Sequence, residues 1–169
     1  DYRLNYTGHR DLGGGIILDS SHEIDYLRWM FGEVEQVYCL AGVLSDLDVD
    51  AEDTASMVLR FAVGCVGEIH LDFVQRVRSR NCKIVGTEGT IYWDNLDESI
   101  RLYTTKTNEW NTFVLPIDPN DKYLSEIEFF LESLDMEQEL DADVRSARRT
   151  LEISLAALES ARTQCAVAC

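Results

Sequence analysis

Seven short segments with strand character follow one another between residues 34 and 115. The clearest pair is Thr54–Phe61 and Cys65–Phe73, where apolar and polar residues alternate on either side of the short Ala62-Val63-Gly64 connection. Parallel neighbours need a crossover of about a dozen residues or more, so connections this short predict antiparallel pairing. The other expected strands are Val34–Val43, Arg80–Gly86, Thr90–Asp94, Ser99–Thr104 and Trp110–Leu115.

Helical periodicity precedes and follows this series of strands. Apolar residues from Ile17 to Phe31 recur at helical spacing, and two more helices are expected at the end of the chain. Asp118 and Pro119 suit the start of the first, and the second is expected over residues 143–161. Their predicted inner faces are Leu124, Ile127, Leu131 and Leu134 in the first, and Val144, Ala147, Leu151, Leu155 and Leu158 in the second. This order predicts an α+β fold: one open, mainly antiparallel sheet of about six to seven strands with helices on one face.

Length and charge limit the function classes. A chain of 169 residues is expected to form a single domain over residues 1–169. Its formal net charge of −16 disfavours nucleic acid and anionic membrane as partners. The chain has no apolar run long enough for a membrane span and no apolar signal segment at its start. Five cysteines without a CxxC pair favour a reducing, cytoplasmic setting.

The segment Gly13–Asp25 holds the sharpest candidate site. A glycine turn opens a predicted helix in which Asp19, His22 and Asp25 form an i, i+3, i+6 ladder on one face. Imidazole in general titrates near neutral pH, so a histidine between two carboxylates is a candidate proton-transfer group. The alternative is a helix histidine that pairs with Asp19 or Glu23 and has no catalytic role.

Three arginines alternate in the predicted strand region at Arg76, Arg78 and Arg80. Arginine binds carboxylate and phosphate groups in bidentate geometry, so this row is a candidate site for a charged sugar. The alternative is a set of ion pairs with nearby Asp and Glu side chains.

Two acidic groups resemble metal sites only in part. Asp46, Asp48 and Asp50 imitate the start of a calcium loop, but glycine and glutamate are missing at the positions that such a loop requires. His70 alternates with Glu68 and Asp72 without an evident fourth ligand. We therefore predict no metal site, and we expect His70 to lie on a sheet surface or a subunit interface.

Four segments together resemble the C-terminal domain of the Gfo/Idh/MocA oxidoreductases, relatives of glucose-fructose oxidoreductase and inositol dehydrogenase. They are Gly13-Gly14-Gly15-Ile16-Ile17-Leu18-Asp19 with His22, Asp25 and Phe31-Gly32; Glu52-Asp53-Thr54-Ala55 through Leu59-Arg60-Phe61; Val85-Gly86-Thr87-Glu88-Gly89-Thr90-Ile91; and the final Ala157-Leu158-Glu159-Ser160-Ala161. The resemblance implies a sheet domain similar to that of dihydrodipicolinate reductase. It also implies that an N-terminal Rossmann domain, absent from this chain, binds most of the cofactor, NAD or NADP.

The resemblance further implies an activity and a set of site residues. The substrate would be a sugar, sugar acid or nucleotide sugar whose hydroxyl is oxidised by hydride transfer. His22 would be the acid/base, Asp19 would orient it or bind a hydroxyl, and Asp25 would contact substrate or brace Arg28. Gly14 and Gly15 would let cofactor and substrate approach the backbone.

One departure from the family pattern concerns the histidine. The family's usual spacing is Asp-x-x-x-His, whereas this chain has Asp19-x-x-His22.

The catalytic lysine of the family lies in the missing half, so the isolated chain is expected to be inactive. A homodimer or homotetramer through the sheet face is expected. The alternatives are an NAD-dependent glycosidase or lyase-type relative and a non-catalytic dimerisation module.

Overall fold

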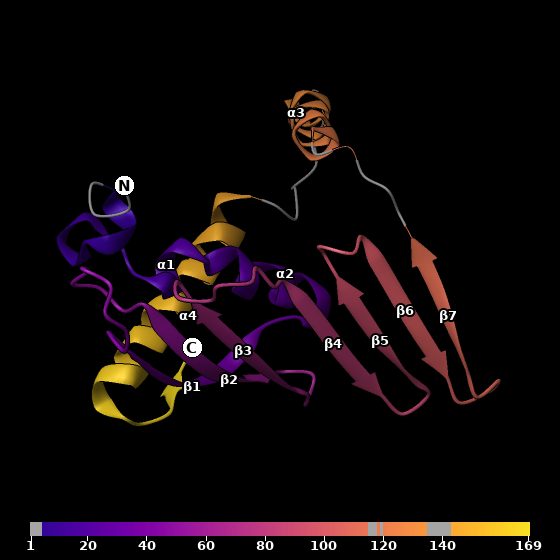
Figure 1. Cartoon of the computed structure of the whole chain (residues 1–169), viewed down its shortest axis with the longest axis horizontal. Coiled ribbons are helices and arrows are strands. Elements are labelled where there is room, and N and C mark those ends of the chain that lie inside the picture. The colour runs from indigo at the N-terminus through magenta and orange to yellow at the C-terminus, as the bar shows by residue number, and fades with distance from the viewer. Residues whose placement is uncertain (1–4, 115–117, 119, 135–142) are drawn as a thin grey trace. The chain divides into compact units, whose positions relative to one another are not determined.

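The computed structural model describes residues 5–114, 118, 120–134 and 143–169. The chain divides into two compact units (Figure 1). The first comprises Asp1–Val74 and Glu139–Cys169, and the second comprises Gln75–Gln138. Each unit contains a four-stranded sheet of its own.

The sheet of the first unit has the order β3-β2-β1-β8. Its strands are β1 (Val34–Gly42), β2 (Thr54–Phe61), β3 (Val66–Asp72) and β8 (Val167–Ala168), and each neighbouring pair is antiparallel. The predicted hairpin between β2 and β3 is confirmed, and Gly64 in its turn has a φ of 89°. The sequence analysis missed β8 because two residues are too few to show a pattern.

The second unit contains an antiparallel meander. Its strands are β4 (Asn81–Gly86), β5 (Gly89–Asp94), β6 (Ser99–Thr104) and β7 (Glu109–Val114), paired in chain order. The prediction of one sheet of six to seven strands was therefore wrong. Within the described residues β3 pairs only with β2 and β4 only with β5, because residues 73–80 between them form no strand. Leu115 and Pro119, named in the predictions, lie outside the described residues.

The second unit also contains α3 (Asp121–Leu134). The apolar stripe predicted for this helix is present, but at least half of each of its side chains is exposed. None of the helices in the described ranges is long and apolar enough to cross a membrane.

Among the described residues of the first unit, the helical elements are two 3-10 turns, η2 (Tyr6–Gly8) and η3 (Arg10–Leu12), and three helices, α1 (Ile16–Asp19), α2 (Ser21–Phe31) and α4 (Val144–Thr163). Asp143 caps α4, since its carboxylate accepts a hydrogen bond of 2.8 Å from the Ser146 amide. Figure 1 shows α4 running across the sheet of this unit, where it contacts β1 and α2. The helices thus cover one face of the sheet, and the residues of the candidate site lie in α1 and α2.

The core of the first unit lies between this sheet and the helices. Every second residue of β2 is buried, as the predicted alternation of apolar and polar residues requires; these residues are Ala55, Met57, Leu59 and Phe61. Ile17 of α1, Ile24 of α2 and Ile153 of α4 are fully buried as well. The sheet therefore anchors the two short helices that carry Asp19 and His22.

The predicted inner face of α4 was wrong. Leu151 and Leu155 are about half exposed. The buried residues are Thr150, Ile153, Ser154, Ala157 and Ser160. Small hydroxyl side chains tolerate burial here because each finds a partner: the Ser154 hydroxyl donates to a carbonyl of its own helix, and that of Ser160 accepts from the Cys39 amide of β1 at 2.9 Å.

Candidate active site

The glycine turn is closed by hydrogen bonds within the chain. The amides of Gly14 and Gly15 donate to the carbonyls of His9 and Thr7, both at 2.9 Å. A Cβ atom at Gly14 would lie 2.2 Å from the Tyr6 carbonyl oxygen, too close for any other residue. The turn thus fixes the preceding 3-10 segment against the start of α1.

Gly15 approaches a second element equally closely. Its φ is 111°, and a Cβ there would lie 2.2 Å from Oε1 of Glu52. The Glu52 carbonyl accepts from the Ile16 amide at 2.9 Å, and its carboxylate accepts a longer bond of 3.4 Å from the Ile17 amide. The buried Glu52 therefore holds the first amides of α1, where an anion is favourable. Both predicted cofactor-binding glycines are buried against the chain itself.

The predicted ladder of Asp19, His22 and Asp25 does not lie on one continuous helix. α1 ends at Asp19, α2 begins at Ser21, and Ser20 between them has φ −105° and ψ 27°. The Glu23 amide bonds to the Ser20 carbonyl only three residues back, which marks the start of a new helix. The expectation of a single helix was therefore wrong, and each of the three side chains has its own partner.

Asp19 is paired with a tyrosine from the segment before the glycine turn. The Tyr6 hydroxyl donates to Oδ1 of Asp19 at 2.9 Å. This hydrogen bond, together with the carboxylate's charge, raises the pKa of Tyr6 above its ordinary value. The sequence analysis did not name Tyr6.

His22 lies next to Glu23 at the start of α2. Its Nε2 is 3.2 Å from Oε1 of Glu23, and more than half of the imidazole is exposed whereas the Glu23 side chain is mostly buried. This separation is short enough for an ion pair when the ring carries its second proton. Of the two carboxylates weighed for the alternative pairing, the structure selects Glu23.

Asp25 belongs to a network that joins α2 to α4. Its Oδ1 accepts a bond of 2.5 Å from the Thr150 hydroxyl. Arg28 donates to the Ser146 carbonyl at 2.9 Å, to Thr150 at 3.0 Å and to Glu33 at 2.7 Å. The hydrogen bond from Arg28 holds the pKa of Glu33 below its ordinary value. The structure thus gives Asp25 a contact that braces the helix carrying His22.

The three predicted arginines do not lie on a strand. Arg76 and Arg78 are exposed in the connection between β3 and β4, and Arg80 immediately precedes β4. The guanidinium of Arg80 lies over the Trp93 ring, 5.8 Å from its centroid. The predicted row on one strand face was therefore wrong, because this part of the second unit has no strand pairing.

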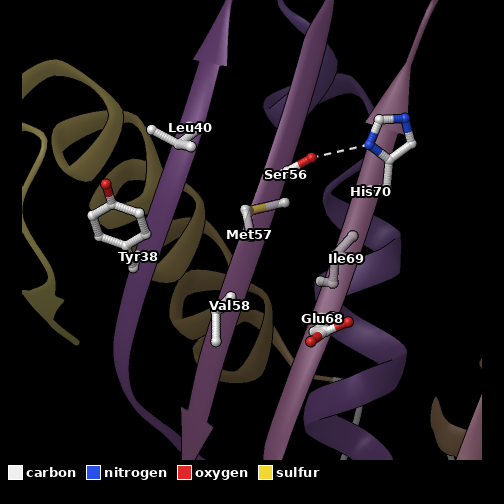
Figure 2. Close-up of a pocket in the computed structure, with 8 residues that line it drawn as sticks. All are labelled: Tyr38, Leu40, Ser56, Met57, Val58, Glu68, Ile69 and His70. Carbon is white, nitrogen blue, oxygen red and sulfur yellow. Dashed lines mark hydrogen bonds between the residues drawn. The ribbon is translucent and has the colours of Figure 1, made fainter.

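The outer face of the first sheet contains a shallow pocket of about 420 Å³ (Figure 2). Its lining residues are Tyr38, Leu40, Ser56, Met57, Val58, Glu68, Ile69 and His70. His70 bonds through Nδ1 to the Ser56 hydroxyl at 3.0 Å, and its Nε2 is 3.2 Å from Asp72. Both ring nitrogens are thus engaged by the sheet, as expected for a surface histidine. In the part of the chain that the structure describes, no cluster of His, Cys, Asp or Glu side chains is arranged to hold a metal ion.

Residues 2–92, more than half of the chain, match the model of the GFO/IDH/MocA C-terminal domain. The chain belongs to this family. A search of curated proteins gives no significant match. The resemblance inferred from the glycine segment and the first hairpin is confirmed.

Solved structures of oxidoreductases share the fold. Levoglucosan dehydrogenase in complex with NADH and levoglucosan superposes with a TM-score of 0.87 at 20% identity, over 98% of this chain and 53% of that one. An NAD binding oxidoreductase from Klebsiella pneumoniae gives 0.89 at 14% identity, over 98% and 54%. The WlbA dehydrogenase from Bordetella pertussis, in complex with NADH and UDP-GlcNAcA, gives 0.74 at 24% identity, over 96% and 48%. The chain therefore spans about half the length of these enzymes.

The described residues do not form a cradle for a dinucleotide. The glycine turn, the one feature of the site that could admit a phosphate, is filled by the chain's own carbonyls and by the Glu52 carboxylate. The polar side chains of this region are Tyr6 in η2, Asp19 at the end of α1, and His22 and Glu23 at the start of α2.

Proposed function

We propose that this chain is the substrate-binding half of an NAD(P)-dependent oxidoreductase that acts on a hydroxyl of a sugar, sugar acid or nucleotide sugar. The observation that carries the proposal is the exposed His22 imidazole, paired with Glu23 directly after the family's glycine turn. The cofactor and the family's lysine would belong to the half of the protein outside this chain.

The chemistry assigned to His22 is removal of the hydroxyl proton. When the carbon of an alcohol loses a hydride, its oxygen must also lose a proton, and a positioned base avoids free alkoxide. With Nε2–H donating to Glu23, Nδ1 accepts that proton, and the carboxylate stabilises the imidazolium that forms. Glu23 would therefore act as the orienting carboxylate that the sequence analysis assigned to Asp19.

The remaining predicted residues have narrower roles in this proposal. Asp19 would bind a substrate hydroxyl, and Asp25 would keep α2 in place through Thr150. Arg76 and Arg78, exposed in the connection before β4, are proposed to bind an anionic group. Gly14 and Gly15 would act indirectly, by fixing the backbone from which the helices carrying Asp19 and His22 start.

A second copy of the chain is proposed to cover the outer face of the first sheet. This face exposes apolar side chains: Leu40 and Val58 line the pocket of Figure 2, and Val66 lies on the same face of β3 as Glu68 and His70. Light scattering on the two-domain protein tests this assembly. Val58→Lys is expected to lower the oligomer size, and an unchanged size would contradict the interface.

The experiment uses the two-domain protein that contains this chain, a set of sugars that begins with levoglucosan and UDP-GlcNAcA, and the absorbance of reduced nicotinamide. His22→Asn is expected to lower kcat by about 10²–10⁴-fold while cofactor affinity is retained, the usual effect of losing a general base. Glu23→Gln is expected to lower kcat less. Glu35→Gln, the same change at an exposed site, is the control.

Other outcomes separate the alternatives. Turnover without net reduction of the cofactor would favour the glycosidase or lyase-type reaction, because the hydride returns to the product. Unchanged turnover in His22→Asn would contradict the proposal and favour a non-catalytic module. The isolated 169-residue chain is expected to show no turnover, and hydride transfer by this chain alone would contradict the assignment of the cofactor to the other half.

A further inference from the structure

Tyr6 reaches Asp19 from outside the two short helices. It lies in η2, and its hydroxyl donates to Oδ1 of Asp19, thirteen residues further along the chain, at 2.9 Å. Over residues 5–114, 118, 120–134 and 143–169, no second side chain is hydrogen-bonded to Asp19. About half of the Tyr6 side chain is exposed, so the pair lies at the surface that a ligand can reach.

The backbone fixes Tyr6 in this position. The Gly14 and Gly15 amides bond to the two carbonyls that flank Gly8, and the missing side chain of Gly14 makes room for the Tyr6 carbonyl. The amide of Asp50 adds a bond to the Gly8 carbonyl at 3.1 Å. The 3-10 segment is thus held at several points, and the Tyr6–Asp19 contact follows from this fixed geometry.

In the Tyr6–Asp19 pair, the phenol is the donor and the carboxylate is the acceptor. The Asp19 carboxylate raises the pKa of Tyr6, so the phenol remains a neutral donor and takes up one carboxylate oxygen. The second oxygen, Oδ2, is left to accept. A carboxylate oxygen is a strong acceptor for a hydroxyl hydrogen, and charge-assisted bonds of this kind are shorter and stronger than neutral ones.

We propose that Tyr6 is a positioning residue of the substrate site: its phenol holds Asp19 so that Oδ2 accepts a hydrogen bond from a sugar hydroxyl. This inference rests on the proposed function. It adds a residue that precedes the glycine turn, and it gives Asp19 a role in affinity rather than in proton transfer.

The test measures kinetics and binding in the two-domain protein, with whichever sugar of the set above is turned over fastest. Tyr6→Phe is expected to raise KM about threefold to tenfold, the effect of losing one hydrogen bond, and to leave kcat within about twofold. Asp19→Asn is expected to raise KM more. The double variant is expected to resemble Asp19→Asn alone, because both changes remove the same contact.

Two further measurements separate positioning from a general structural role. Tyr6→Phe is expected to weaken sugar binding in calorimetry while the Kd for the cofactor and the melting temperature stay unchanged. Tyr123→Phe, the same change at an exposed tyrosine of α3, is the control. An unchanged KM, additive effects of the two single variants, or a parallel loss of cofactor affinity would each overturn the proposal.

The two proposals fail in distinguishable ways. If His22→Asn abolishes turnover and Tyr6→Phe leaves KM unchanged, only the role of Tyr6 is wrong. If no sugar is turned over, or if His22→Asn keeps full activity, the proposed function is wrong and the role of Tyr6 is wrong with it.

Discussion

Replacing Asp53 with Asn removes one negative charge from a fully buried carboxylate at the start of β2. Oδ1 accepts from the Leu44 amide at 2.9 Å and the Thr54 hydroxyl at 3.0 Å. Oδ2 accepts from the amide and the hydroxyl of Ser45, at 3.1 Å and 2.5 Å. The carboxylate therefore organises the loop that joins β1 to β2.

The structure allows the cost of Asp53→Asn to be estimated. The amide can keep the two bonds to Oδ1, but its NH₂ group replaces Oδ2 and faces the Ser45 amide, which is also a donor. Both charge-assisted bonds to Oδ2 are lost: the Ser45 hydroxyl can turn to accept from the new NH₂ group, but the part-buried Ser45 amide is left without an acceptor. We expect the free energy of unfolding to fall by about 2–4 kcal/mol.

The effect should depend on pH in a defined direction. Burial alone would raise the pKa of Asp53, but the hydrogen bonds from Leu44, Ser45 and Thr54 outweigh it, so the pKa lies below its ordinary value of 3.8. A depressed pKa in the folded state stabilises the fold above the unfolded-state value, and this contribution is lost as pH falls through the folded-state value. The difference between the wild-type chain and Asp53→Asn should therefore narrow below about pH 4.

Urea unfolding of the 169-residue chain, followed by circular dichroism at several pH values, measures both effects. Asp46→Asn is the matched control, because it makes the same change at an exposed carboxylate of the same loop and should alter stability by less than about 0.5 kcal/mol. If Asp53→Asn were no more destabilising than Asp46→Asn at neutral pH, the assigned role of the carboxylate would be wrong.

Two further predictions concern the core of the first unit. Gly15→Ala should lower the free energy of unfolding by about 3 kcal/mol, because its φ of 111° disfavours a side chain and the new Cβ would meet Glu52. Gly64→Ala is the control: its φ is 89° but its surroundings are open, so the loss should be only about 1 kcal/mol. Equal losses in urea unfolding would contradict the close approach of Gly15 to Glu52. Burial, reinforced by the charge of Glu52, raises the pKa of the Cys39 thiol to about 11. Maleimide at pH 8 should therefore label the exposed Cys165 before Cys39 in the folded chain. Equal labelling rates of the two cysteines in mass spectrometry would refute this prediction.

The strands were the most predictable part of the fold. The bounds of β2 and β6 agree with the sequence prediction because alternation of apolar and polar residues marks both. What alternation does not record is where pairing between strands stops. The alternation of Arg76, Val77 and Arg78 is typical of a strand, yet residues 73–80 form no strand. The chain therefore has two separate sheets where one was expected.

The candidate site was predictable only in part. His22 and Asp19 follow from the glycine turn, which a sequence shows directly. The partner of Asp19 does not, since Tyr6 meets it only after the chain has closed on Gly14. The sequence does offer one signal. Glycine at position 14 indicates that another segment of the chain approaches the backbone there too closely for a side chain. For His22, the pairing with Glu23 was one of the two alternatives that the sequence left open.

The buried hydroxyl side chains on one side of α4 affect which substitutions homologous chains can accept on its other side. Ser160 bonds to β1 and Thr150 bonds to Asp25 of α2, so these contacts fix which side of the helix faces the interior. Leu151 and Leu155, about half exposed, contribute little to that interior. Polar replacements at these two leucines should therefore be neutral for folding of the chain alone. If homologous chains nevertheless retain bulky apolar residues at both positions, the selection that keeps them acts on a contact outside these 169 residues.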